Sequence, residues 1–361
     1  MTITFLIQDI TTNGGTERTT LCLAREMVRH GHSVAIISLF RQLQHLSYDI
    51  PNDVRLVFAT DLAYNLQIGL RKRLIYIYRA RKSLMQLPEW KSADVIICQK
   101  LLASVTAFLS NAHHHAIACE HFRYEMYTPI IRYLRTKLYR HFRTLVVLTE
   151  QDAKHFRSKI PCVQVIPNMI SIRPLPYRGQ KSKTIISIGR LTDQKGFDRL
   201  LRAIHHIDSR LGDYHVDIYG EGENEQALIL QRDTLQLQHR VTFHPFERHI
   251  EHIYQHAAFY VMSSRFEGFP MVLLEAAAAG LPIVSFDCPE GPATLLQNGG
   301  GILVTDGDIN NLGNAILRMI QDDDFRSLCQ RQSPEIVKPY LPETIYQHWN
   351  NLLEAIHQIN A

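Results

Sequence analysis

Residues 259–282 read FYVMSSRFEGFPMVLLEAAAAGLP, and this stretch decides the fold class. Its first four residues, 259–262, form a short apolar run that predicts a buried strand. A helix is expected to start near Pro270, because a proline in the first helical turn loses no hydrogen bond. The alanines after Glu275 propagate that helix and Gly280 ends it. A buried strand followed by a helix is the unit from which parallel α/β sheets are built.

The same alternation of strand and helix extends along the chain on both sides of this stretch. Before residue 150, runs rich in β-branched residues predict strands at 3–7, 34–38, 54–58, 95–98, 117–119 and 145–148. The longer segments between them predict helices at about 16–30, 69–87, 101–111, 125–142 and 150–158. After residue 180 the pattern starts again, with strands at 184–188, 216–219, 241–243, 259–262, 282–285 and 302–304.

Two such runs predict an α/β protein of two Rossmann-like domains that face each other across a cleft. The boundary is expected within 161–179, where four prolines and a glycine disfavour helix. We expect one domain over residues 1–170 and a second over 171–335. The remaining residues, 336–361, contain a last helix at about 343–358, which follows interruptions at Pro334, Pro339 and Pro342.

The composition excludes several classes of protein. Hydrophobic residues make up 45% of the chain and charged residues 20%, which is typical of a globular protein. None of the six cysteines forms a CxxC pair, which argues against a zinc ribbon or a disulfide framework and favours a cytoplasmic protein with reduced thiols. No apolar stretch of 18 residues is free of charge, and the first residues do not resemble a signal peptide.

The net charge of +4 conceals two halves of opposite sign. Residues 1–170 contain 22 Lys and Arg against 12 Asp and Glu, whereas residues 171–361 contain 17 against 23. Much of the positive charge falls in 71–82 and 132–143. An anionic membrane surface or a phosphate-bearing acceptor would fit these segments. Nucleic acid is not an expected partner, because no recognised reading motif is present.

The alternative for the second basic segment is a helix that packs an apolar stripe into the core and leaves its charges solvated. The stripe would consist of Ile131, Leu134, Leu138 and Phe142. The basic face would consist of Arg132, Arg135, Arg140 and Arg143.

Two glutamates, Glu267 and Glu275, stand on either side of the predicted helix start. The backbone N–H groups of the first turn, including those of Met271 and Val272, are expected to be free to bind a phosphate. A ligand with hydroxyl groups on both sides of a diphosphate would meet both carboxylates. The alternative is a helix cap with one exposed glutamate, which leaves the rest of EGFPMVLLEAAAAG unexplained.

A second motif follows the strand 184–188, where Gly189 and Arg190 come directly after the strand and Lys195 lies five residues further on. Anions bind at such strand ends in α/β proteins, and two fixed cations would balance a diphosphate without a metal. The alternative is a pair of solvated surface charges.

The first half of the chain has two weaker motifs. Gly14 and Gly15 follow the first strand, where two glycines allow the backbone and the next helix start to approach a ligand closely. His121 follows the strand 117–119 and should face the crevice at the carboxyl ends of the strands. Neither the dinucleotide-binding fingerprint nor a P-loop is present, so NAD and P-loop chemistry are not supported.

Together these motifs resemble the retaining glycosyltransferases of family four, which have the GT-B fold. The C-terminal half carries the resemblance in IGRLTDQKGFDRLLRA, DIYGEGENE, SSRFEGFPMVLLEAAAAGLPIVSFDCPEGP and GGGILV. The N-terminal half carries it in GGTER and the pair Glu120–His121. The tract SFDCPEGP is similar to bacterial enzymes that extend lipid-linked or lipopolysaccharide glycans.

The resemblance implies a role for each matching residue. Arg190 and Lys195 would hold the donor diphosphate, Glu275 the ribose, and Glu267 the donor sugar. The implied catalytic residues are His121, Arg190, Lys195 and Glu267, and the implied donor-binding residues are Gly15, Gly189, Phe269, Pro270, Met271, Val272, Leu274 and Glu275. Uracil would lie near 246–248, although His244 and Pro245 stand where the family usually has Leu-Gly.

The implied function is retaining transfer of a hexose or N-acetylhexosamine from a nucleotide diphosphate sugar, with UDP favoured, to a glycan acceptor. The N-terminal domain would bind that acceptor, which is expected to be lipid-linked and to serve surface polysaccharide or lipopolysaccharide synthesis. The C-terminal domain would bind the donor, and the last helix would pack back on the N-terminal domain. We expect no metal or other cofactor, and a cytoplasmic protein that binds peripherally to the inner face of the bacterial inner membrane.

Two alternatives stay open at this point. One is a nucleotide-sugar epimerase with the GT-B fold. The other is a non-catalytic glycan- or membrane-binding protein, against which the complete set Arg190, Lys195, Glu267 and Glu275 argues.

Overall fold

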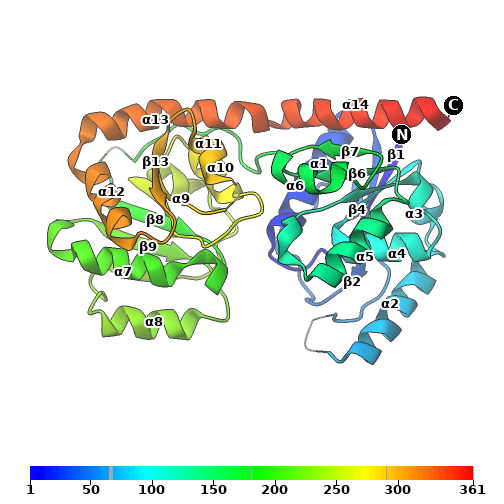
Figure 1. Ribbon diagram of the computed structural model, residues 1–361, viewed down its shortest axis with the longest axis horizontal. Helices are drawn as coiled ribbons and strands as arrows, with labels where there is room; N and C mark the ends of the chain where they lie inside the picture. Colours follow the sequence, from blue (N-terminus) through cyan, green and yellow to red (C-terminus); the bar gives the residue numbers. More distant parts are fainter. Residues whose placement is uncertain (65–67, 180, 290, 361) are drawn as a thin grey trace. The chain divides into compact units, whose positions relative to one another are not determined.

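The computed structural model describes residues 1–64, 68–179, 181–289 and 291–360. The chain divides into two compact units (Figure 1). The first comprises Met1–Ser171 together with Tyr340–Ala361, and the second comprises Ile172–Pro339. Each unit contains its own parallel sheet, so the α/β fold class predicted from the alternation of strand and helix is confirmed.

The first unit has a seven-stranded sheet in the order β3-β2-β1-β4-β5-β6-β7, with every neighbouring pair parallel. Its strands are β1 (Thr2–Asp9), β2 (Ser33–Phe40), β3 (Val54–Phe58), β4 (Val95–Gln99), β5 (Ala116–Cys119), β6 (Thr144–Val147) and β7 (Val163–Val165). The last strand lies inside the stretch expected to be a linker. It has three residues between two prolines, and such a short strand is tolerated because β7 is at the edge of the sheet.

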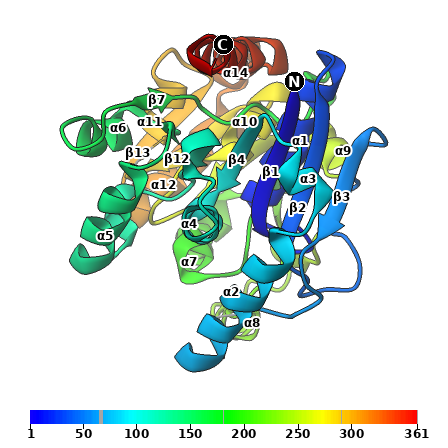
Figure 2. The ribbon, with the colours of Figure 1, turned by 90° about the vertical axis from the view of Figure 1, so that its right-hand side faces the viewer.

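Helices cover both faces of this sheet: α1 (Gly15–Arg29), α2 (Leu70–Leu84), α3 (Pro88–Lys91), α4 (Lys100–Leu109), α5 (Pro129–Tyr139), α6 (Glu150–Arg157) and α14 (Pro342–Asn360). Side chains of α1 and α14 share one core cluster with Ile3, Phe5 and Ile7. Leu6 points the other way, into a cluster with side chains of α2, α4, α5 and α6, as the two-residue period of a strand requires. Figure 2 shows helices on both sides of the strands of this sheet. The helix expected at 125–142 is shorter than predicted, because a 3-10 turn at Tyr124–Met126 precedes Pro129.

The last helix, α14, belongs to the first unit rather than to the second, which precedes it in sequence. Ile345, Trp349, Leu353 and Ile356 are buried in the same cluster as β1. The chain passes from one unit to the other at Lys338–Tyr340, a 3-10 turn.

Pro334 does not interrupt the chain, contrary to the sequence prediction. It lies inside α13 (Asp323–Val337). A proline in a helix interior removes one hydrogen bond. Here, however, Ser333, Ile336 and Val337 are buried around it, and this packing maintains the last turn of the helix.

The second unit has a six-stranded parallel sheet in the order β10-β9-β8-β11-β12-β13. Its strands are β8 (Thr184–Ile188), β9 (His215–Tyr219), β10 (Val241–His244), β11 (Phe259–Met262), β12 (Ile283–Asp287) and β13 (Gly301–Thr305). Its helices are α7 (Phe197–Ile207), α8 (Glu225–Thr234), α9 (Glu251–His256), α10 (Met271–Ala278), α11 (Pro292–Leu296), α12 (Ile309–Gln321) and α13. The strand order reverses between β8 and β11, as it does between β1 and β4 in the first unit. Ligands of open α/β sheets bind at the carboxyl ends of the strands at such points.

The packing of α14 gives a stability prediction. Trp349→Ala should lower the free energy of unfolding of the first unit by about 3–5 kcal/mol, because it leaves a cavity beneath the helix. Urea denaturation followed by circular dichroism measures the change. Leu328→Ala, at an exposed position of α13, is the matched control and should change stability by about 0.5 kcal/mol or less. Equal effects of the two variants would contradict the assignment of α14 to the first core.

Candidate active site

The loops that follow β8 and β11 meet at the carboxyl end of the second sheet, because these two central strands are neighbours. The loop after β8 contains Gly189, Arg190 and a 3-10 turn that ends at Lys195. The loop after β11 contains Ser264 and Glu267. The Lys195 Nζ lies 2.8 Å from Glu267 Oε1, and the Ser264 hydroxyl donates to the same oxygen at 2.6 Å. Two residues that are 72 positions apart in sequence thus form one ion pair.

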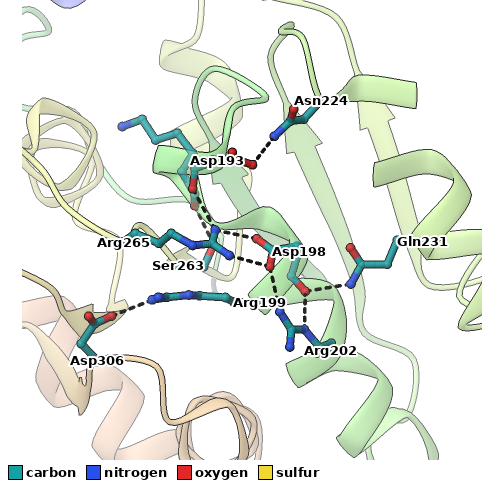
Figure 3. A network of polar contacts seen from close by, with 10 residues as sticks. Asp193, Asp198, Arg199, Arg202, Asn224, Gln231, Ser263, Arg265 and Asp306 are labelled. Atoms are coloured by element: carbon teal, nitrogen blue, oxygen red, sulfur yellow. Dashed lines mark hydrogen bonds and ion pairs between the residues drawn. The ribbon is translucent and has the colours of Figure 1, made fainter. Parts of the chain in front are cut away.

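A network of polar contacts joins the two loops (Figure 3). Arg265 binds Asp198 at the start of α7 through two parallel hydrogen bonds of 2.7 and 2.8 Å. The Arg265 guanidinium also donates to the Asp193 carbonyl at 2.8 Å, and Ser263 Oγ donates to the Lys195 carbonyl at 3.1 Å. Burial raises the pKa of Asp198, but hydrogen bonds from Arg265 and Arg202 outweigh it, so that the pKa lies below its usual range. Asp198 is therefore ionised, and its ion pair with Arg265 holds the loop after β11 against the start of α7.

Gly196 makes this close approach sterically feasible. Its φ of 63° lies in the left-handed region, and a Cβ at this position would lie 2.2 Å from the Ser263 carbonyl oxygen. A side chain at Gly196 would therefore push the two loops apart.

The start of α10 differs in detail from the sequence prediction. Pro270 precedes the helix instead of lying in its first turn, because its ψ of 77° is not helical. The Met271 N–H is not free, since it donates to the Phe269 carbonyl at 2.9 Å in a tight turn around Pro270. The Val272 N–H makes no hydrogen bond among the described residues and is the available donor of the first turn.

Both glutamates of this segment are buried, which contradicts the alternative of a helix cap with one exposed glutamate. The Tyr254 hydroxyl donates to Glu275 Oε2 at 3.0 Å. Burial raises the pKa of Tyr260, and the charges of Glu267 and Glu275 act in the same direction, so that both carboxylates lie near this ring. The Tyr260 hydroxyl donates to the Ile188 carbonyl at 3.1 Å, which connects the glutamates to the end of β8.

Arg190 and Gly189 lie beside this cluster at the end of β8. The Arg190 side chain is exposed, and its guanidinium makes no hydrogen bond or ion pair with the part of the chain that the structure describes. At Gly189 a Cβ would lie 3.1 Å from the Lys195 side chain, so the absence of a side chain at this glycine leaves room for the lysine. The structure thus gathers Lys195, Glu267 and the end of β8, with Arg190 available to a ligand.

The region expected to bind a base lies after β10. The His244 ring stacks on Tyr219, with centroids 4.5 Å apart, and the Phe246 N–H donates to Glu221 Oε1 at 3.4 Å. His244, which stands where the family usually has leucine, thus stacks on a tyrosine of the neighbouring strand β9.

In the first unit, His121 lies at the carboxyl end of β5 and contacts the Gln99 side-chain oxygen at the end of β4. Burial lowers the pKa of His121 to about 3, and the positive charge of Lys100 acts in the same direction. The ring is therefore neutral at pH 7. His121 and Gln99 line a pocket that also contains Thr20, Asn168 and Trp349.

A buried ion pair holds the loop that carries His121. Arg135, on α5, donates to Glu120 Oε2 at 2.8 Å and to the Tyr124 carbonyl at 2.8 Å, and Tyr139 donates to the same Glu120 oxygen at 2.9 Å. Burial raises the pKa of Glu120, while Arg135 and Tyr139 oppose that shift. Residues 120–124 are thus attached to α5 directly beside His121.

The two faces of α5 differ from the expected ones. Arg135 was predicted on the basic face but is fully buried, because Glu120 requires a partner in the core. Of the predicted apolar stripe, Phe142 is buried and Leu138 is partly buried, whereas Ile131 and Leu134 are exposed. The alternative of a stripe packed fully into the core is therefore wrong.

The sequence did not predict the side-chain partners of Glu120, Arg135, Tyr254 or Asp198. Their partners are 15 to 67 residues away, so no local pattern connects them. Glu120 had one usable signal, since it directly precedes His121 after a predicted strand.

Two features are absent from residues 1–64, 68–179, 181–289 and 291–360. No group of three or more His, Cys, Asp or Glu side chains there is arranged to hold a metal ion. No helix there is long and apolar enough to cross a bilayer.

Comparison with known proteins identifies the class. The solved structure of sucrose-phosphate synthase from Thermosynechococcus elongatus superimposes with a TM-score of 0.84 at 17% identity, over 99% of this chain and 100% of that one. The pneumococcal O-GlcNAc transferase GtfA, in complex with UDP and GlcNAc, does so with a TM-score of 0.79 at 14% identity, over 98% and 99%. The fold is that of the two-domain GT-B glycosyltransferases.

The family follows from sequence. Residues 13–173 match the model of "Glycosyltransferase Family 4" and residues 173–335 that of "Glycosyl transferases group 1". The amylovoran biosynthesis glycosyltransferase AmsD of Erwinia amylovora is 26% identical over 365 residues, which cover 96% of this chain and 98% of AmsD. The chain therefore belongs to the family of glycosyltransferases that these two models describe, and the family resemblance of its motifs is confirmed.

The environment of His121 predicts a specific pH dependence of stability. Because its pKa is about 3 in the folded chain and 6.5 normally, the unfolded chain binds the proton first. Stability from this group is complete above pH 6.5 and is lost as the pH falls towards 3, by up to about 1.4 kcal/mol per pH unit. His121→Gln should remove this loss in urea denaturation at a series of pH values. His45→Gln, at an exposed position, should leave the wild-type profile unchanged, and parallel profiles of all three proteins would refute the assignment.

Proposed function

We propose that this protein is a retaining glycosyltransferase that moves a hexose or N-acetylhexosamine from a UDP-sugar to a hydroxyl group of a glycan acceptor. The observation that carries the proposal is the ion pair between Lys195 and Glu267 in the loops after β8 and β11. Arg190 follows β8 directly, and its exposed guanidinium has no hydrogen bond or ion pair with the described residues. One cation is held in place by a buried carboxylate while a second remains available to an anion.

A diphosphate matches the charge and the donors of this site. Arg190 and Lys195 supply two positive charges, and the Val272 N–H supplies a donor at the start of α10. Glu275 is assigned to the ribose hydroxyl groups and Glu267 to the donor sugar. Phe269, Pro270 and Leu274, together with Gly189 and the backbone of Met271, are assigned to the walls of the donor site. In the first unit, His121 is assigned to the transferred sugar and Gly15 to the diphosphate.

Transfer would proceed through an oxocarbenium-like sugar. The bond between the anomeric carbon and the phosphate oxygen breaks, and its electron pair stays on the nucleotide. Arg190 and Lys195 stabilise this charge more in the transition state than in the ground state, which accelerates the step. The acceptor hydroxyl attacks from the face that the nucleotide leaves and gives its proton to the departing phosphate oxygen, so the configuration is retained. The positive charges of Arg190 and Lys195 would stabilise the leaving diphosphate. We therefore propose that no metal is required.

Relatives support the donor and the biological setting. GtfA binds UDP and GlcNAc, and AmsD is named for amylovoran biosynthesis. By analogy, we assign this chain a UDP-sugar donor and a role in bacterial surface polysaccharide or lipopolysaccharide synthesis, with a lipid-linked acceptor.

Arg190→Ala and Glu275→Gln test the site with opposite kinetic signatures. Loss of Arg190 should lower turnover about 10²- to 10³-fold, because it removes charge stabilisation in the transition state. Glu275→Gln should mainly raise the KM for the donor, because it weakens ribose binding in both states. Release of UDP from a panel of UDP-sugars, with a polyprenyl-diphosphate-linked acceptor, provides the measurement.

The controls separate the site from the rest of the chain. Arg210→Ala, an exposed arginine in the turn Asp208–Arg210, should behave as the wild type. EDTA should not change the rate, and the product should keep the anomeric configuration of the donor. Unchanged kinetics of Arg190→Ala and Glu275→Gln, or an acceptor-independent epimer as the product, would reject the proposal.

A surface of the first unit supports binding to an anionic membrane. Helices α2 and α5 both pack against α4 on the same face of the sheet. Each has large apolar side chains that are more than half exposed: Leu74, Ile75 and Tyr78 on α2, and Ile130, Tyr133 and Leu134 on α5. Basic residues of 71–82 and 132–143 stand among them. Apolar side chains surrounded by lysines and arginines are typical of helices that lie in the interface of an anionic bilayer.

Vesicle binding tests this surface. The wild type should cosediment with vesicles that contain phosphatidylglycerol and not with vesicles of phosphatidylcholine alone, and salt should weaken the binding. The double variant Ile130→Ser/Leu134→Ser should bind at least about tenfold more weakly than the wild type. Burial of each apolar side chain in the membrane would contribute about 1.5–3 kcal/mol to the binding free energy. Leu230→Ser, exposed on α8 of the second unit, is the matched control. Equal binding of both variants would exclude this surface.

A further inference from the structure

Lys100 has an unusual backbone conformation at the carboxyl end of β4. Its φ is +71°, in the left-handed region, although it is not a glycine. Such a conformation is unfavourable for a residue with a side chain and persists where the surrounding structure holds it. β4 is the neighbour of β1 at the point where the strand order of the first sheet reverses.

The Lys100 side chain contacts the start of α1. Its Nζ lies 3.3 Å from Glu17 Oε1 and 5.4 Å from the centre of the Phe122 ring. Glu17 is only 4% exposed and lies in the first turn of α1, two residues after Gly15. Lys100 also lies close enough to His121 to lower the pKa of its ring. The Lys100 ammonium therefore pairs with the first turn of α1 and lies over Phe122, the residue that follows His121.

Glu17 places a negative charge where the glycine loop should receive an anion. Its second oxygen, Oε2, is buried and has no hydrogen-bond partner in the described part of the chain. That oxygen lies over Gly14, since a Cβ there would be 2.2 Å from it. Burial raises the pKa of Asp9, and the charge of Glu17 acts in the same direction. Without a cation, this carboxylate would repel any phosphate that approached the helix start.

The space beside the helix start is open. A Cβ at Gly15 would meet nothing within 4 Å among the described residues. The Lys100 ammonium has three N–H donors, and among the described residues it donates a hydrogen bond to Glu17 alone. The Lys100 side chain is one-fifth exposed, so the remaining donors are within reach of a ligand.

We propose that Lys100 is an anion-binding residue of the first unit, which neutralises Glu17 and holds a diphosphate group beside Gly14 and Gly15. The proposal rests on the proposed function, because that function supplies the diphosphate. The diphosphate belongs either to the UDP-sugar donor or to the polyprenyl-diphosphate-linked acceptor, and the two sources share the chemistry that Lys100 recognises.

Calorimetric titration of the full-length protein with UDP and with farnesyl diphosphate tests the proposal and separates the two sources. Lys100→Met should weaken binding of the relevant probe about 10- to 100-fold, because it removes one charged hydrogen bond and exposes the ligand to Glu17. A loss for UDP alone indicates the donor, and a loss for farnesyl diphosphate alone indicates the acceptor. Uridine, which has no phosphate, should bind all variants equally.

A double variant distinguishes charge compensation from simple damage to the fold. Glu17→Gln/Lys100→Met should recover most of the lost affinity, because the repelling carboxylate is gone, and Lys100→Arg should bind nearly as the wild type. If Lys100→Met fails to fold, the diphosphate affinities of the double variant and of Glu17→Gln alone still test whether Lys100 compensates the charge of Glu17. Glu17→Gln should bind the diphosphate at least as tightly as the wild type.

Arg190→Ala keeps the two proposals separable. If Arg190→Ala loses UDP binding while Lys100→Met binds both probes as the wild type does, the role of Lys100 is wrong and the proposed function stands. If Arg190→Ala has no effect and Lys100→Met loses a probe, the donor site is wrong and the anion site stands. A wild type that binds neither UDP nor farnesyl diphosphate overturns both.

Discussion

The second unit depends on the bidentate ion pair between Arg265 and Asp198. It joins the loop after β11 to the start of α7 and leaves little freedom to either, because two parallel hydrogen bonds fix both distance and orientation. The pairing of Lys195 with Glu267 follows from this constraint, since both residues belong to the joined loops. Gly196 allows the loops to meet, and any side chain there would separate the lysine from its carboxylate.

A common principle of charge compensation links the two units. In each, a lysine after a strand is paired with a buried glutamate at a point where the strand order reverses: Lys195 with Glu267, and Lys100 with Glu17. A paired lysine is held in a defined position and still has donors to spare for a phosphate. Arg135 differs, because it is fully buried against Glu120 and serves to hold the loop next to His121.

Most of the fold could be predicted from the sequence. Twelve strands and the alternation with helices followed from short apolar runs, because a strand buried on both faces has a continuous apolar pattern. The exceptions have physical reasons. β7 is too short for its pattern to stand out between two prolines, and Pro334 is accommodated by packing that no local window contains. The faces of α5 were misassigned, because helical periodicity cannot tell which of two faces finds a partner in the core.

The order of strands and helices, the division into two α/β runs and the residues that follow each strand can all be derived from the sequence. These properties are local, since they depend on the period of apolar residues and on glycine and proline. The pairing of charges, in contrast, depends on the three-dimensional fold. Lys195 and Glu267 are 72 residues apart and Lys100 and Glu17 are 83 apart, and sheet order alone brings their strands together. The location of α14 in the first unit was likewise decided by packing, because its apolar face is buried against residues at the other end of the chain.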